Sequence, residues 1–299
     1  MQHRRVLLVD AFAEEPYAGN PAGVVLDAEG LSPGQMQTIA AEIGASETAF
    51  LTPSSRADRR IRYFTPTTEV DLCGHATIAS LLTLDRTGEF EPGDHRIETN
   101  VGVLDVTVTE SDVAWMTQSS PDVDEVDLPY EMVAEALGVD EVALEEVGND
   151  LPLARASTGL PFLVVPVAFL ENLGGADPDF AAIEALAKAV DAEGVYAFTF
   201  DTIDAESTIH GRAFVPGAGV PEDPVTGTAS GATGAYLRAF DAFDEMPEQL
   251  IVEQGHFVDR PGRVYVRVGE AVEVGGRATV VLDGRITEPE SDEDGIIEV

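Results

Sequence analysis

Residues 69–76 read Glu-Val-Asp-Leu-Cys-Gly-His-Ala, and residues 222–229 read Glu-Asp-Pro-Val-Thr-Gly-Thr-Ala. In each stretch an acidic approach ends in a polar-Gly-polar-Ala step, and a run of small and apolar residues at helical spacing follows. This pattern predicts a buried helix that begins near the glycine. The first N–H groups of a helix have no partner within it and carry the positive end of its dipole, so each start could hold an anion. The simpler interpretation of either stretch alone is a capped core helix, but two in register predict two like halves that share one anionic ligand.

The length of the chain allows one large domain or two of ordinary size, and we favour two. The chain has 299 residues, of which 44% are hydrophobic, so a large core can form. We expect an N-terminal half over residues 1–118 and a C-terminal half over residues 119–286, whose closing strand could pack on the other half. Residues 287–299 have the composition of a solvated acidic tail.

The charge balance is strongly acidic. Asp and Glu number 55 against 17 Lys and Arg, which gives a formal net charge of −38. Such a surface repels nucleic acids and anionic membranes, so neither is an expected partner. Because the acids are interleaved with apolar residues, they indicate a folded, salt-adapted protein and not a disordered one. At molar salt a Debye length of about 3 Å screens the repulsion, and at lower salt we expect partial unfolding.

The expected compartment is the cytoplasm. Cys73 is the only cysteine, so no intramolecular disulfide can form and a reducing environment suits the chain. The first ten residues are too short and too soon acidic for a signal peptide. No apolar run approaches the roughly 20 residues that a membrane helix needs.

Hydrophobic periodicity predicts an α+β fold. Expected helices run from Pro33, with Ser32 as N-cap, to the stop at Gly44, and over residues 74–86, 132–137, 180–190 and 226–240. Expected strands cover residues 6–9, 23–26, 45–51, 61–64, 96–98, 101–108, 113–116, 154–157, 162–167, 195–200, 208–215, 251–253, 263–268, 271–274 and 277–282. Many strands with one buried, small-residue helix per half predict two pseudo-symmetric halves. Each half would be a curved, barrel-like, mainly antiparallel sheet around a central helix, unlike a doubly wound parallel sheet.

Several side chains could carry chemistry. Glu47 lies in an apolar strand, where it is either solvated or buried, and burial would raise its pKa towards the range of a general acid/base. His75 is either a helix-start or core histidine or a catalytic one, and Asp223 is either a turn acid or part of a site. Cys73 at a helix start would have a lowered thiol pKa, although a single cysteine is usually inert packing.

Neither a metal nor a nucleotide cofactor is expected. The histidines show no metal-ligand spacing along the sequence; they are His3, His75, His95, His210 and His256. No glycine-rich phosphate loop follows a strand in the dinucleotide-binding pattern.

Several motifs resemble the phenazine-biosynthesis PhzF-like isomerase family. They are residues 10–22, 46–50 and 64–77 in the first half, and 157–162, 212–216, 222–229, 254–255 and 260–261 in the second. The resemblance extends over roughly residues 6–282. It implies a cofactor-independent isomerase with a diaminopimelate-epimerase-like fold, an active site in the cleft between the halves, a small carboxylic acid as substrate and a homodimer.

The resemblance also implies roles for individual residues. Glu47 matches the acid/base that takes a proton from one carbon and returns it elsewhere, while His75 and Asp223 match residues that hold or polarise the substrate. The expected substrate-binding residues are Asn20, Cys73, Gly74, Thr226, Gly227 and Thr228. Thr228 occupies a position where serine is common in that family, and threonine supplies the same hydroxyl group.

Two other functions stay open. Racemases of this fold use two cysteines, one at each helix start, and Thr226 at the second start excludes that mechanism. A dehydratase that uses Cys73 opposite Thr226 is the first alternative. A non-catalytic small-molecule binding protein is the second, and the presence of the whole acid/base set argues against it.

Overall fold

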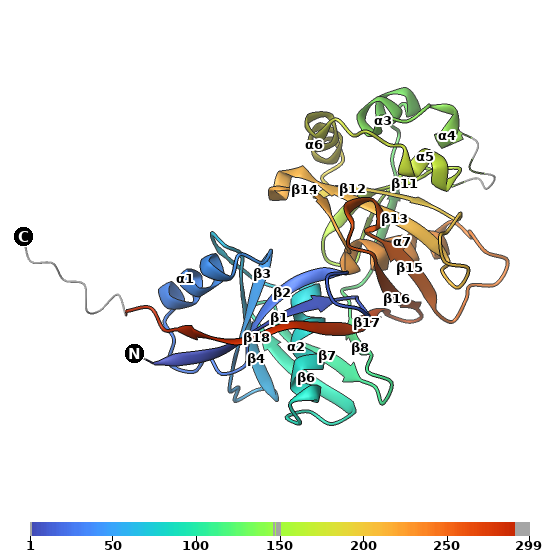
Figure 1. Ribbon diagram of the computed structural model, residues 1–299. Helices are drawn as coiled ribbons and strands as arrows, with labels where there is room; N and C mark the ends of the chain where they lie inside the picture. Colours follow the sequence, from blue (N-terminus) through green and yellow to red (C-terminus); the bar gives the residue numbers. More distant parts are fainter. Residues whose placement is uncertain (1, 146, 148–150, 291–299) are drawn as a thin grey trace, which may run out of the picture. The chain divides into compact units, whose positions relative to one another are not determined.

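The computed structural model describes residues 2–145, 147 and 151–290. The described chain forms two compact units (Figure 1). The first comprises residues 2–116 and 276–290, and the second comprises residues 117–275. Each unit is described by itself below.

The first unit is built from β-strands around one buried helix. Its elements are β1 (His3–Ala11), β2 (Asn20–Val25), α1 (Pro33–Ile43), β3 (Glu47–Thr52), β4 (Arg59–Phe64), β5 (Glu69–Val70), α2 (Gly74–Arg86), β6 (Gly93–Thr99), β7 (Gly102–Val108), β8 (Ala114–Thr117) and β18 (Ala278–Thr287). β1 pairs antiparallel with both β18 and β2, and β2 pairs parallel with β3. β4 pairs antiparallel with β3 and β5 and parallel with β6, which continues antiparallel into β7 and β8.

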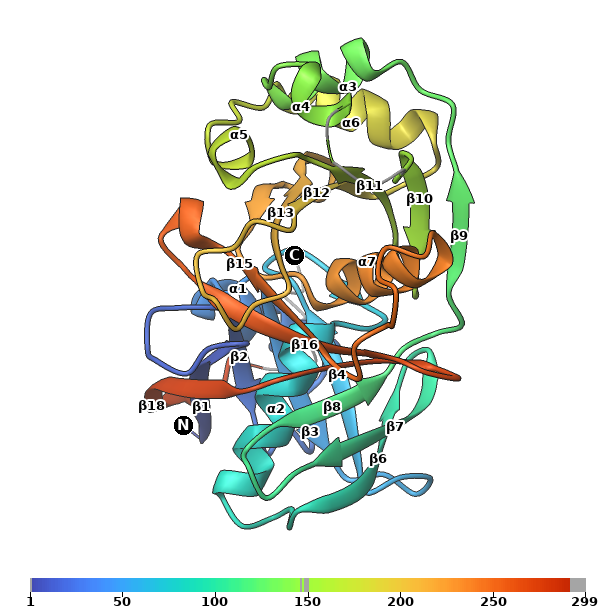
Figure 2. The ribbon, with the colours of Figure 1, turned by 90° about the vertical axis from the view of Figure 1, so that its right-hand side faces the viewer.

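The buried helix α2 fixes where this unit places its functional groups. Nine of its residues are buried, and it contacts β1, β2, β3, β7 and β18. Figure 2 shows these strands on several sides of α2. A helix that is apolar or small all round belongs in a core, so the strands surround it. The packing of α2 against these strands fixes the position of its first turn, which begins at Gly74.

The second unit repeats this plan. Its elements are β9 (Asp122–Glu125), α3 (Tyr130–Leu137), α4 (Val142–Glu145), β10 (Ala154–Ser157), β11 (Pro161–Pro166), α5 (Leu170–Gly174), α6 (Phe180–Ala189), β12 (Gly194–Thr199), β13 (Ile209–Val215), η1 (Pro216–Ala218), β14 (Val220–Asp223), α7 (Gly227–Ala239), β15 (Leu250–Gln254), η2 (His256–Val258), β16 (Gly262–Val268) and β17 (Val272–Gly276). β10 pairs antiparallel with β9 and β11, as β1 does with β18 and β2. The parallel pairs β11–β12 and β13–β15 repeat β2–β3 and β4–β6.

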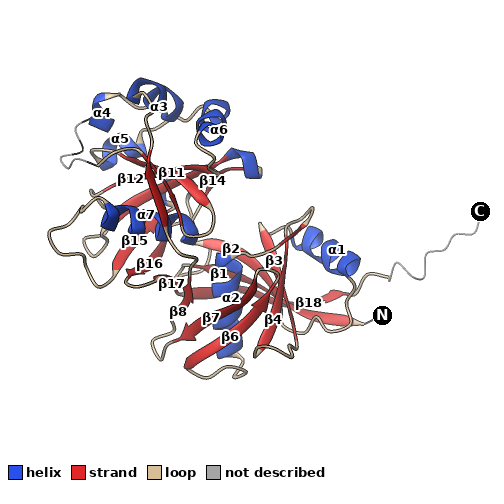
Figure 3. Ribbon diagram, turned by 180° about the vertical axis from the view of Figure 1, so that it is seen from behind, coloured by secondary structure: helices blue, strands red, loops and turns tan. Residues whose placement is uncertain are grey.

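The repeat of strand pairing confirms the predicted likeness of the halves. β14 adds to β13 as β5 adds to β4, and α7 follows β14 as α2 follows β5. Figure 3 shows strands as the main component of each unit, with α2 and α7 among them. Ten residues of α7 are buried, and its Gly231 and Gly234 lie so close to Val274 and Val266 that a Cβ on either glycine would collide with a valine methyl.

Each predicted helix and strand is present, within a few residues at its ends. Helix α1 begins with Pro33 after a capping box between Ser32 and Gln35, and it ends at Gly44 in the left-handed conformation. Seven short elements were not predicted, namely β5, β9, β14, α4, α5, η1 and η2. These are too short to show a period, and β9 consists of acidic residues around one valine.

The C-terminal strand lies with the first unit. β18 pairs along its length with β1, as was allowed for the closing strand of the half expected over residues 119–286. The solvated tail expected from residue 287 does not begin there. Thr287 ends β18, the Glu288 N–H donates to Gln2, and the Glu288 carboxylate pairs with Arg4 at 2.6 Å. The rest of that predicted tail, residues 291–299, lies outside the described residues.

Within the described residues, no helix combines the length and apolar character needed to cross a membrane.

Candidate active site

The first unit brings Glu47, His75 and Cys73 together at the start of α2. His75 Nε2 lies 3.2 Å from Glu47 Oε2 and 3.2 Å from Ser46 Oγ. On the other side of the ring, Nδ1 lies 3.5 Å from Cys73 Sγ. The side chains of Glu47 and His75 are 22% and 12% exposed, so both are accessible to a small molecule. An acid, an imidazole and a thiol in contact can hold and exchange a proton.

Local structure sets this arrangement. Glu47 is the first residue of β3 and pairs with Ala22 on the parallel strand β2. Ser46 Oγ lies 3.3 Å from Pro21 O, so its hydroxyl can donate to that carbonyl and accept from the N–H of His75. In that tautomer Nε2 carries the hydrogen and also faces the Glu47 carboxylate.

Buried hydroxyl groups of two side chains fix the start of α2. Thr77 Oγ1 donates to Cys73 O at 2.7 Å, and the Tyr63 hydroxyl lies 2.7 Å from Thr77 Oγ1. Burial raises the pKa of Tyr63, so this hydroxyl keeps its proton and donates. Cys73 is the N-cap, and its side chain accepts no bond from the first turn. Gly74 follows as the first helical residue, and a ligand at this end therefore meets backbone N–H groups and not a capping side chain.

Asn20 lies on the adjoining strand. It is the first residue of β2, pairs with Ala11 and is 1% exposed. The approach to α2 is held by Arg62 and Glu69, which form two hydrogen bonds of 2.8 and 2.7 Å. The bond from Arg62 lowers the pKa of Glu69, so Glu69 stays ionised and fixes β5 immediately before the helix start.

The second unit assembles a different group at the start of α7. The hydroxyl of Thr226, the N-cap, donates to Asp223 Oδ2, and Thr226 itself caps no backbone N–H. Gly227 and Thr228 are the first two helical residues, and Thr158 Oγ1 donates to Thr228 O at 3.3 Å. Ser230 donates to Thr226 O at 2.9 Å, in the same way that Thr77 holds Cys73 O.

Gln254 organises this second group and was not predicted as a site residue. Its Nε2 donates to Asp223 O at 2.8 Å and to Thr226 Oγ1 at 3.1 Å. Its Oε1 accepts from Thr226 N at 3.2 Å and from the Tyr196 hydroxyl at 3.3 Å. Residues 254–255 belong to one of the family motifs. Gln254 was assigned no function from the sequence, because a side-chain amide is not an acid or a base. Its four hydrogen bonds depend on the packing of β15 beside the start of α7, which no local sequence pattern specifies.

The predicted residues thus form two groups, one in each unit. Glu47, Cys73 and His75 are in mutual contact in the first. Asp223 and Thr226 are in contact in the second, with Gly227 and Thr228 next in the helix. The expectation that both helix starts serve one substrate stays a prediction.

Two clusters of described residues offer donor atoms of metal-ligand type within 4.8 Å of one another. One is Glu47, Cys73 and His75, and the other is His210, Glu253 and His256. Neither follows a ligand spacing in the sequence, because the contacts arise between strands and helix ends. Burial, followed by repulsion from His210, lowers the pKa of His256 below its ordinary value. Burial raises the pKa of Glu253, but hydrogen bonds from His210, Ile203 and Asp204 outweigh it and bring the value to about 2.

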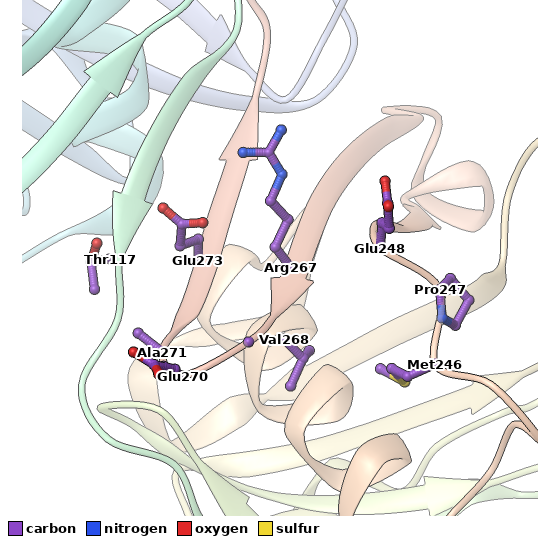
Figure 4. Close-up of a pocket in the computed structure, with 10 residues that line it drawn as sticks. Thr117, Met246, Pro247, Glu248, Arg267, Val268, Glu270, Ala271 and Glu273 are labelled. Carbon is purple, nitrogen blue, oxygen red and sulfur yellow. The ribbon is translucent and has the colours of Figure 1, made fainter.

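A cavity of about 460 Å³ lies elsewhere in the second unit, beside the turn between β16 and β17. Its lining residues are Thr117, Met246, Pro247, Glu248, Arg267, Val268, Gly269, Glu270, Ala271 and Glu273. Figure 4 shows Arg267 and Glu273 on these two strands, where they are register partners. None of the predicted site residues lines this cavity.

Comparisons with known proteins show the family to which the chain belongs. The model of the phenazine biosynthesis-like (PhzC-PhzF) family matches residues 9–284. The isomerase YfhB of Bacillus subtilis is 38% identical over 289 residues, which cover 95% of this chain and 96% of YfhB. The trans-2,3-dihydro-3-hydroxyanthranilate isomerase of Pseudomonas aeruginosa is 30% identical, over 94% of this chain and 98% of that enzyme. The crystal structure of a PhzF-family phenazine biosynthesis protein from Bacillus anthracis superposes with a TM-score of 0.87 at 35% identity, over 96% of this chain and 100% of that one.

The matches extend over nearly the whole described chain and over nearly the whole of each relative. The predicted diaminopimelate-epimerase-like fold is confirmed, with most of the structure in β-strands. The chain therefore belongs to the phenazine biosynthesis-like PhzF family, and it is an isomerase of that family.

Proposed function

We propose that this isomerase moves a proton between two carbon atoms of a small carboxylic acid, without a cofactor, and that Glu47 is its general acid/base. The observation that carries the proposal is the Glu47 carboxylate 3.2 Å from His75 Nε2, at a helix start whose N-cap side chain caps no N–H. The similarity to an isomerase named for an unsaturated hydroxy amino acid supports this class of reaction and substrate.

The first step is proton abstraction. Glu47 takes a proton from an acidic C–H, and the electron pair of that bond delocalises into the conjugated system of the substrate. The negative charge that develops there meets the N–H groups at the start of α2. Because these donors are fixed before the reaction, they stabilise the transition state without reorganising.

The second step returns the proton. Protonated Glu47 delivers it to a different carbon of the conjugated system, so one C–H bond breaks, one forms, and the double bond shifts between them. His75 stays beside Glu47, with Nε2 3.2 Å from the carboxylate, and limits its movement. In the second unit, Asp223 holds or polarises the substrate. Gln254 and Thr226 fix the position of Asp223 through their hydrogen bonds to it.

Proton exchange into candidate acids tests this role. The enzyme is incubated with unsaturated amino and hydroxy acids in deuterated buffer at molar KCl, and mass spectrometry measures deuterium uptake. We expect Glu47→Gln to lower the exchange rate by about 10²- to 10⁴-fold. The control Glu42→Gln, an exposed acid on α1, should exchange like the wild type.

The same experiment separates the alternatives. Cys73 Sγ lies 3.5 Å from His75 Nδ1, which is the observation that favours a Cys73-based dehydratase. Loss of activity in Cys73→Ser with full activity in Glu47→Gln would support that dehydratase and reject the proposal. Binding of a carboxylate without any exchange would instead indicate a binding protein. The homodimer also stays a prediction, which light scattering of the purified protein at molar salt can test.

A further inference from the structure

A second cluster of ionisable side chains lies in the second unit, apart from the groups used in the proposed reaction. His210 is on β13, and Glu253 is its register partner on the parallel strand β15. His256 follows in η2, and the rings of His210 and His256 have centroids 5.2 Å apart. His210 is 0% and Glu253 1% exposed, while His256 is half-buried.

Glu253 fixes the orientation of the His210 ring. Its carboxylate lies 2.8 Å from His210 Nδ1 and also accepts from the backbone N–H groups of Ile203 at 2.6 Å and Asp204 at 3.1 Å. A carboxylate so engaged accepts and does not donate, so the hydrogen of the ring lies on Nδ1. In the neutral ring, Nε2 of His210 is therefore a bare acceptor.

Two buried ring nitrogens then lack a partner. His210 Nε2 and His256 Nδ1 have no hydrogen-bond partner within the described part of the chain. Buried polar atoms are nearly always satisfied, so a pair of such nitrogens on neighbouring rings points to a bound species. A bare imidazole nitrogen has a lone pair to offer, which suits a metal ion.

The surrounding charge favours a cation. Arg263 is paired with Asp204, so its charge is balanced locally. The negative charge of the buried Glu253 carboxylate is not balanced by Arg263, so a cation in the cluster would neutralise it. A carboxylate that holds a histidine by one ring nitrogen while the other binds a metal is the usual support of a metal-bound histidine.

We propose that His210 and His256 bind one divalent transition-metal ion of the zinc class, with Glu253 holding the His210 ring. Imidazole ligands select zinc, cobalt, nickel or copper over magnesium and calcium. The ligand atoms of the cluster lie within 4.8 Å of one another. Two nitrogens on a tetrahedral zinc ion are roughly 3.4 Å apart, so the two rings must shift until their unpartnered nitrogens reach this distance. The half-buried His256 is the ligand able to make this shift, and solvent can complete the coordination.

The ion would have a structural effect near Gln254. It would join β13 to η2, directly after the strand residue that positions Asp223 and Thr226. The proposal does not depend on the proposed reaction, because neither histidine belongs to the Glu47 group.

Cobalt binding tests the site directly. The full chain is freed of metal with a chelator, dialysed into molar KCl and titrated with Co²⁺, with visible absorption and calorimetry as readouts. We expect one equivalent to bind with a ligand-field spectrum, and Zn²⁺ to displace it. His256→Gln should weaken binding at least about tenfold and remain folded by circular dichroism, because only a half-buried side chain changes.

Two other variants show which of the two clusters binds the ion. The control His3→Gln removes an exposed histidine and should bind as the wild type does. His75→Gln removes the histidine of the other cluster and should also retain binding. Absence of Co²⁺ binding in the wild type, or binding that His75→Gln abolishes and His256→Gln leaves intact, would overturn the proposal.

Discussion

In the proposed reaction, pairs of side chains a few ångströms apart carry the chemistry. Glu47 and His75 come from different elements, a strand start and a helix start, and meet at 3.2 Å. Other contacts fix both elements. β3 pairs with β2, and the hydroxyl groups of Tyr63 and Thr77 fix the start of α2. Reacting groups placed on rigid elements keep their geometry, which is what acid/base catalysis needs.

The Glu69 carboxylate should make a stability contribution that depends on pH. Its folded-state pKa is lowered, chiefly by Arg62, so the contribution is complete above the unfolded pKa of about 4.5. It is lost as the pH falls through the lower folded-state pKa. We expect Glu69→Gln to lower the free energy of unfolding by about 0.5–1 kcal/mol at pH 7, reduced for solvent screening, and by little at acid pH.

Urea unfolding of wild type and Glu69→Gln at several pH values measures this difference. Glu42→Gln makes the same chemical change on an exposed site and should show no such pH dependence. A difference that grows as the pH falls would contradict the assigned role of Arg62.

At the scale of elements, small residues decide how closely the strands and central helices approach. Gly231 and Gly234 let α7 lie against β16 and β17. On β13, Gly211 faces the Tyr196 hydroxyl, which in turn donates to Gln254. The position of the second helix start therefore depends on a strand residue that has no side chain.

Gly211→Ala should destabilise the second unit. The new Cβ would lie 2.0 Å from the Tyr196 oxygen, so the ring must move and the bond to Gln254 is disturbed. Overpacking of this kind costs about 1–3 kcal/mol. Thermal and urea unfolding measure the change. Gly217→Ala, whose Cβ would have no atom closer than 3.9 Å, is the matched control and should change stability by less than about 0.5 kcal/mol. Equal stability of the two variants would show that β13 adjusts freely.

At the scale of the whole molecule, we expect the net charge to affect stability. A formal charge of −38 on 299 residues produces self-repulsion that only ions can screen. The Debye length rises from about 3 Å at 1 M salt to about 10 Å at 0.1 M, so repulsion between surface carboxylates strengthens as salt is removed.

We expect the melting temperature to fall when KCl is lowered from molar to about 0.1 M, because screening is lost. Differential scanning calorimetry across this range measures it. The triple variant Glu135→Gln, Glu141→Gln, Glu145→Gln, which neutralises exposed acids in and near α3 and α4, should show a weaker dependence on salt. A melting temperature that does not fall at low salt would reject salt adaptation.

Local sequence patterns determined the elements of this protein. Ser32, Pro33 and Gly44 define α1 because caps and stops act within a turn of the chain. The two polar-Gly-polar-Ala steps located the starts of α2 and α7 for the same reason. The family motifs also placed Glu47, His75 and Asp223 among the expected site residues.

Contacts between distant segments were decided only by the tertiary structure. The pairing of β18 with β1 joins the two ends of the chain, and no local pattern specifies a partner so far along the sequence. Gln254 holds Asp223 and Thr226, and His210 meets Glu253 and His256, because β15 lies beside β13 and the start of α7. Hydrogen bonds and metal sites depend on distances of a few ångströms. Such distances between remote residues are set by strand pairing and helix packing, so the sequence supplied the groups and the fold supplied their geometry.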